Sequence, residues 1–142
     1  MALTLSEHWQ ITKPAVVSKH GLVASHHHEA SGIGAEVLAA GGNAVDAAVA
    51  TGLAIGVAEP WMSGIGGCGY MMIYNAESGT CQVVDFGVIA PQTLDPMDYP
   101  LENAADTDDD LFGWPRVVED RNVQGPLSIA VPGHVAGLST AL

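Results

Sequence analysis

The stretch that decides how its neighbours are interpreted is Ser63-Gly64-Ile65-Gly66-Gly67-Cys68-Gly69-Tyr70. Four glycines fall between Gly64 and Gly69, and glycine this dense weakens any regular element. A phosphate-binding loop would need GxxxxGK[ST], or GxGxxG leading from a strand into a helix. Here an alanine-rich segment precedes the glycines, a strand-like run follows them, and no lysine comes next. The glycines therefore indicate tight packing or a backbone that lines a substrate.

The apolar segment 44–58, before the loop, predicts a helix. Apolar and small residues fall at i, i+3, i+4, i+7 and i+8 on one face, namely Val45, Ala48, Val49, Gly52 and Leu53. Asn43 can cap its start, and Glu59-Pro60 ends it. Because the other face is also small and nearly apolar, we expect both sides to be buried. Asp46 is expected to be buried and hydrogen-bonded, in a structural role.

Two runs after the loop, 70–75 and 80–86, predict a β-hairpin closed by the turn 76–79. If Asn75 faces Thr80, then Tyr70 lies opposite Asp85 and Cys68 lies opposite Gly87. Cys81 is then about 20 Å along the strand from Cys68. That separation excludes a disulfide between the two cysteines.

The other segments complete one partial domain of mixed α/β (α+β) class over residues 1–142. In chain order we expect a lead-in 1–15, a β-capable run 21–25, a helix 30–40 stopped by Gly41-Gly42, an acidic loop at about 102–115, a strand 128–131 and a helix from His134 that runs to the last residue.

Composition limits the function classes. Sixteen acidic residues against four basic ones give a net charge of −12, which argues against binding to nucleic acid or to an anionic membrane surface. Charged residues are only 14%, so we expect other protein to cover part of the surface. No secretory signal is seen, and segment 44–58 is too short to span a bilayer, so the sequence predicts a cytoplasmic protein.

Candidate metal and nucleophile residues have simpler alternatives. His26-His27-His28 could bind a metal, but adjacent extended residues point in alternating directions, which favours a polar loop at a helix start. The aspartates 106 and 108–110 lack the spacing of an EF-hand loop, which favours a solvated loop over calcium. Cys68 could be a nucleophile, but the sequence assigns it no base. We expect no metal and no cofactor.

Three blocks of residues resemble the gamma-glutamyltransferase (gamma-glutamyltranspeptidase) family. They are Gly41-Gly42-Asn43-Ala44-Val45-Asp46-Ala47-Ala48-Val49-Ala50, Val57-Ala58-Glu59-Pro60 and Ser63 to Tyr70. Asp85-Phe86 with Ala90-Pro91, and Val131-Pro132-Gly133 with Val135-Ala136-Gly137, follow in the family's order. Each block alone is weak, but together they are specific.

The resemblance implies part of an N-terminal-nucleophile hydrolase, an αββα sandwich. In that family a precursor cleaves itself into a large and a small subunit, and the threonine exposed on the small subunit attacks a gamma-glutamyl amide. This chain resembles the N-terminal part of the large subunit, and none of its seven threonines lies in a processing motif. Residues 1–142 should therefore lack the nucleophile, be inactive alone, and have the rest of the large subunit and the small subunit as partners.

The acyl pocket is where the sequence departs from the family pattern. Gly87 holds the position of an arginine that clamps the alpha-carboxylate of the glutamyl group, and Cys68 stands where the family has a glycine. We expect Gly67, Cys68 and Gly87 to border this pocket. Arg116 or Arg121 could replace the missing arginine.

Three functions remain in view. The resemblance favours gamma-glutamyl transfer or hydrolysis on small, glutathione-type amides. An acylase or amidase of the same fold with another acyl donor is the first alternative. A truncated, non-catalytic, self-associating protein is the second, and homo-oligomers are left open in every case.

Overall fold

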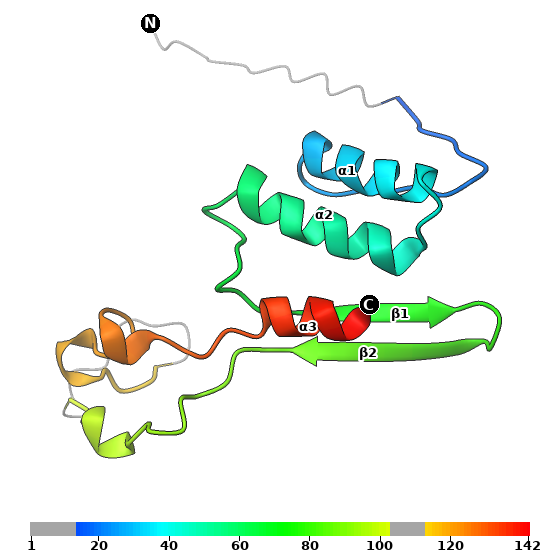
Figure 1. Cartoon of the computed structure of the whole chain (residues 1–142). Helices are drawn as coiled ribbons and strands as arrows, with labels where there is room; N and C mark the ends of the chain where they lie inside the picture. The colour runs from blue at the N-terminus through cyan, green and yellow to red at the C-terminus, as the bar shows by residue number, and fades with distance from the viewer. Residues whose placement is uncertain (1–13, 103–112) are drawn as a thin grey trace, which may run out of the picture.

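The computed structural model describes residues 14–102 and 113–142. Its helices are α1 (His28–Ala39), α2 (Ala44–Ala58) and α3 (His134–Ala141), and its strands are β1 (Gly69–Asn75) and β2 (Thr80–Phe86). Short 3₁₀ turns lie at Pro96–Asp98, Val118–Asp120 and Pro126–Ser128. The α1–α2 pair lies on one side of the β1–β2 hairpin, and the segment between β2 and α3 forms a lobe off the end of the hairpin (Figure 1).

Helices α1 and α2 are antiparallel and joined by the glycines predicted to stop the first helix. Gly41 has φ +99°, and Gly42 donates its N–H to Val37 O at 3.0 Å. Gly34 of α1 faces buried Thr51 of α2 so closely that a Cβ on the glycine would collide with the threonine hydroxyl. The small side chains therefore let the two helix backbones approach each other.

The start of α2 confirms the predicted cap. The Asn43 side chain accepts hydrogen bonds from Val45 N at 2.7 Å and Asp46 N at 3.1 Å. Asp46 in turn accepts the Asn43 N–H at 2.8 Å, which completes a capping box. Asp46 is half-buried rather than buried, and its role is structural as predicted.

The hairpin also confirms its prediction, including the register. Strands β1 and β2 are antiparallel, with Asn75 opposite Thr80 and Tyr70 opposite Asp85. Cys81 pairs with Tyr74, near the turn, while Cys68 lies just before β1, and both cysteines are free.

The core lies between the helices and one face of this hairpin. Val49 of α2, Phe86 of β2 and Leu138 of α3 are buried together, and Met71 and Val84 pack against them. Since side chains alternate along a strand, Tyr70 and Asp85 lie on the opposite, outer face. None of the described residues buries that outer face, where Tyr70 is 72% exposed.

Three predictions about elements were wrong or incomplete. Within the described part of the chain, helix α2 is buried on one side only, because Val57 is 83% and Leu53 is 44% exposed. Residues 128–131 do not form a strand; Pro126 begins a 3₁₀ turn there, and a single bridge joins Val131 to Ile89. The run 21–25 is irregular and pairs with no strand in the described part of the chain.

Two other predicted segments lie mostly outside the residues that the structure describes. Residues 1–13 of the lead-in and 103–112 of the acidic loop lie beyond the described ranges. Within those ranges, no helix has the length and apolar character needed to cross a membrane.

Candidate functional site

The glycine loop is a packing element that joins α2 to the hairpin. A Cβ on Gly56 of α2 would lie 3.2 Å from Gly64 Cα, so helix and loop touch backbone to backbone. Gly67 donates its N–H to Gly64 O at 3.1 Å and closes the loop as a turn. None of the four loop glycines has positive φ. Close approach restricts two of them, because a Cβ on Gly67 would lie 3.2 Å from Gly64 O and a Cβ on Gly69 would lie 2.8 Å from the Phe86 ring, whereas the Cβ positions of Gly64 and Gly66 are open.

The start of α3 brings the glycine loop and the end of β2 together. His134 donates its N–H to Gly67 O at 3.1 Å. A Cβ on Gly133 would lie 2.5 Å from Phe86 O and 2.9 Å from Gly87 O. Gly67 and Gly87, predicted to border one pocket, therefore both contact the first residues of α3.

The Phe86 ring packs against Gly69 and Gly137. This contact was not predicted from the sequence. Cβ atoms on Gly69 or Gly137 would run into the ring, and the His134 ring meets it edge-on with centroids 5.9 Å apart. Gly133 and Gly137 are four residues apart, a spacing that places small residues on one helix face. That spacing could have predicted a close contact on this face of the helix, but it does not indicate that Phe86 is the partner.

The space beside Gly87, where the resemblance leads us to expect an arginine, is open on the outer face of the hairpin. Gly87 donates its N–H to Asp85 Oδ1 at 2.9 Å. A Cβ on Gly87 would lie 3.3 Å from that carboxylate oxygen and 3.8 Å from the Tyr70 hydroxyl, with no other described atom nearby except in its chain neighbours. Cys68 is exposed and free beside this end of the hairpin.

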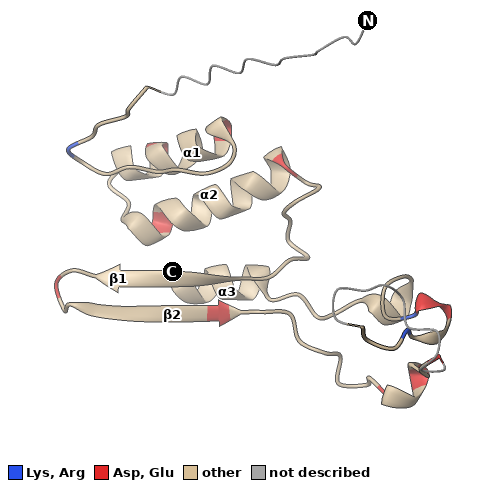
Figure 2. Cartoon of the chain, turned by 180° about the vertical axis from the view of Figure 1, so that it is seen from behind, with Lys and Arg blue, Asp and Glu red and all other residues tan. Residues whose placement is uncertain are grey.

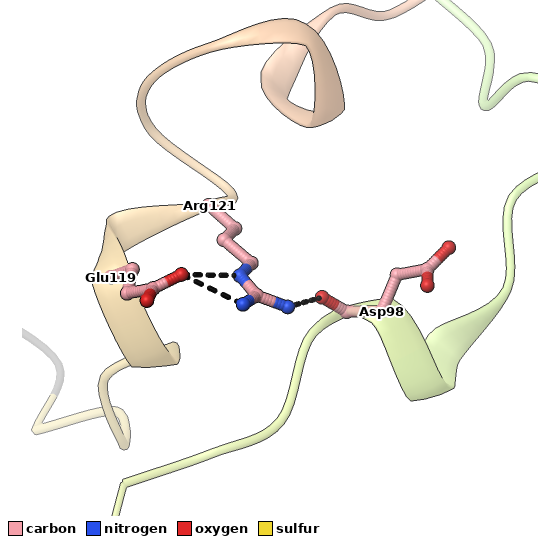
Figure 3. Close-up of polar contacts among 3 residues, drawn as sticks. All are labelled: Asp98, Glu119 and Arg121. Atoms are coloured by element: carbon pink, nitrogen blue, oxygen red, sulfur yellow. Dashed lines mark hydrogen bonds and ion pairs between the residues drawn. The ribbon is translucent and has the colours of Figure 1, made fainter.

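The two arginines proposed as replacements lie in the lobe, away from the hairpin (Figure 2). Arg116 binds both carboxylate oxygens of Asp120, at 3.0 and 2.9 Å. Arg121 binds Glu119 Oε2 through Nε at 3.0 Å and through Nη2 at 2.7 Å (Figure 3). Its third nitrogen contacts Asp98 O at 3.4 Å. The structure therefore does not bring either arginine to Gly87.

These ion pairs surround a strained backbone that no sequence signal indicated. Glu119 and Asp120 have φ of 60° and 52°, the left-handed region that non-glycine residues rarely occupy. Each carboxylate is held by one arginine, at the two ends of the same turn. Both ion pairs therefore act within this turn of the lobe.

The histidine run lies at the start of α1, as predicted. His27 is the N-cap residue and its ring stacks on His28, with centroids 4.9 Å apart. No group of three potential metal ligands occurs among residues 14–102 and 113–142.

The sequence of this chain matches a known family. The family model for gamma-glutamyltranspeptidase matches residues 30–142, most of the chain. The chain belongs to the gamma-glutamyltranspeptidase family. Its mixed helix and strand structure is a fragment of that family's N-terminal-nucleophile hydrolase fold, as the resemblance implied.

Individual proteins are also similar to this chain. The glutathione hydrolase proenzyme of Bacillus subtilis is 41% identical over 92% of this chain. The acylase ACY 1 proenzyme of Pseudomonas sp. is 42% identical, also over 92%. The gamma-glutamyltranspeptidase structure from Helicobacter pylori superposes with a TM-score of 0.70 at 38% identity, covering 89% of this chain and 33% of that one. The chain spans 20% of the B. subtilis protein and 22% of the acylase.

Proposed function

We propose that residues 1–142 are the N-terminal portion of the large subunit of a gamma-glutamyltransferase-like amidohydrolase. The observation that carries this proposal is the family match over residues 30–142. The contacts that join the glycine loop, β2 and α3 support it, because the residues of the family pattern are the ones that meet there.

The proposed reaction is cleavage of a gamma-glutamyl or related amide. A threonine outside this chain attacks the amide carbonyl, with its own free amine as the base. The carbon–nitrogen bond breaks, and the proton taken from the threonine hydroxyl goes to the departing amine. Water or an acceptor amine then takes the acyl group from the threonine, and backbone N–H groups stabilise the oxyanion.

The proposed part of this chain in that reaction is to shape the acyl pocket. Gly67, Cys68 and Gly87 would line its edge at the start of α3, whereas Arg116 and Arg121 would stabilise a turn in the lobe. The partners would be the rest of the large subunit, the small subunit and a small-molecule amide.

Expression of the complete reading frame tests the proposal. The complete protein should cleave itself into two subunits and hydrolyse acyl anilides, and alanine at the first residue of the small subunit should abolish hydrolysis. Residues 1–142 alone should release no aniline. Measured hydrolysis by residues 1–142 alone would show that the nucleophile has been placed wrongly.

Two other functions stay distinguishable. The 42% identity to an acylase proenzyme favours a non-glutamyl acyl donor as the second candidate. Equal rates on gamma-glutamyl and simple acyl anilides would end the glutathione-type assignment. A reading frame with a stop codon after Leu142 would instead favour a non-catalytic, self-associating protein.

A further inference from the structure

The space next to Gly87 is bordered by oxygen atoms. The nearest atoms to its Cβ position are Asp85 Oδ1 at 3.3 Å and the Tyr70 hydroxyl at 3.8 Å. Tyr70 and Asp85 are directly paired across β1 and β2, so their side chains lie on the same, outer face. A ligand group that enters this space therefore meets a carboxylate and a phenol.

The Asp85 carboxylate makes one hydrogen bond, to the backbone N–H of Gly87, and no ion pair with any described residue. Its negative charge is therefore not neutralised locally by the described part of the chain. Tyr70 can donate or accept a hydrogen bond, so it tolerates either charge on a ligand. Asp85 is the group that sets the sign of the charge preferred here.

The two arginines that could reverse this preference are both paired in the lobe. The sequence contains no lysine or arginine between Lys19 and Arg116. Arg116 and Arg121 are paired with Asp120 and Glu119 in the lobe, and Arg121 also holds Asp98 O (Figure 3). To reach Gly87, either arginine would have to leave a carboxylate unpaired in a strained turn.

We propose that the acyl donor of this enzyme carries an ammonium group but no carboxylate at the position next to Gly87, and that Asp85 selects for that ammonium. This inference rests on the proposed amide cleavage and on the placement of Gly87 in the acyl pocket. A donor carboxylate there would face the like charge of Asp85, and the described part of the chain supplies no clamping cation. An ammonium would gain a charge-assisted contact, typically worth about 10- to 100-fold in binding.

Four p-nitroanilides test the two charges separately. The gamma-glutamyl compound has both amine and carboxylate, 4-aminobutyryl has only the amine, glutaryl has only the carboxylate, and butyryl has neither. We expect kcat/KM of the complete protein, after subtraction of the enzyme-free rate, to be highest for 4-aminobutyryl and lowest for glutaryl. The 4-aminobutyryl compound should exceed the gamma-glutamyl compound by about tenfold or more.

Substitutions on the outer face assign the effect to its residues. Asp85→Asn keeps an oxygen that can accept the Gly87 N–H but removes the charge, so the advantage of 4-aminobutyryl over butyryl should fall by about tenfold. Glu77→Gln removes the same charge at the hairpin turn and should leave that ratio unchanged. Gly87→Arg should raise the gamma-glutamyl and glutaryl rates relative to their carboxylate-free partners, whereas Gly87→Gln should not.

The outcomes separate this inference from the proposed function. A kcat/KM for the gamma-glutamyl compound equal to or higher than that for the 4-aminobutyryl compound would overturn the inference. It would not contradict the proposed amide cleavage. An unchanged 4-aminobutyryl to butyryl ratio in Asp85→Asn would overturn the role of Asp85. If the self-cleaved protein hydrolyses none of the four compounds, the proposed function fails, and the inference fails with it.

Discussion

Phe86 shows how single residues organise this chain. Its ring is buried at the meeting point of β2 and α3, and glycines surround it where side chains would collide. Glycine inside a helix ordinarily costs about 0.5–1 kcal/mol relative to alanine. Glycine is nevertheless required at position 137, because the Phe86 ring occupies the space that a side chain there would fill.

Gly137→Ala should therefore destabilise the protein despite its better helix propensity. Overpacking costs about 1–3 kcal/mol, which exceeds the gain of at most about 1 kcal/mol from propensity. Gly32→Ala is the matched control, because Gly32 also lies inside a helix but has open space around its Cβ position. It should stabilise. Urea unfolding of the complete protein measures both changes. If Gly137→Ala were stabilising, this would contradict the close packing of the Phe86 ring against Gly137.

At the scale of elements, local signals and structure agree best at α2. Its capping box satisfies two backbone N–H groups of the first turn and the N–H of Asn43 itself. The turn of the hairpin is similarly local, since the Asn75 side chain accepts the N–H groups of Glu77 and Ser78. Both signals lie within a few residues of what they determine, which is why the sequence predicted the helix start and the strand register.

Asn43→Ala should lower the free energy of unfolding by about 1 kcal/mol, because the N–H groups of Val45 and Asp46 lose their acceptor. Asn43→Ser keeps a capping oxygen and should cost much less. Chemical denaturation of the two variants side by side provides the measurement. Equal losses for alanine and serine would argue against a capping role.

The segments whose structure the sequence did not predict correctly depend on contacts with other parts of the chain. Residues 128–131 have strand propensity, but the Ile89–Val131 bridge is their one pairing in the described part of the chain. The backbone of Glu119 and Asp120 adopts positive φ in a turn where each carboxylate is held by an arginine. Propensity within a short window contains no information about such contacts.

The described part of the chain exposes many large apolar side chains. Much of the exposed area is apolar, including Val57 of α2 and Met72 of the outer hairpin face. This agrees with the low charge content and supports the proposal that further protein covers these faces.

Residues 1–142 produced alone should therefore bind a hydrophobic dye such as ANS and self-associate. Coexpression with the remainder of the proposed enzyme should remove both behaviours, because the apolar faces would then be buried. Dye fluorescence and light scattering of the two preparations provide the comparison. A monomeric, dye-free chain from expression of residues 1–142 alone would contradict the proposed burial.

The sequence by itself determined the helix α2 with its cap, the hairpin with its register, and the family resemblance. Those features follow from neighbouring residues, whose hydrogen bonds and periodicity are local. Only the tertiary structure decided that Phe86 fills the space left by Gly69 and Gly137, that Arg116 and Arg121 are bound in the lobe, and that Asp85 and Tyr70 border the space at Gly87. These features depend on which distant segments pack together, and packing is a property of the whole fold.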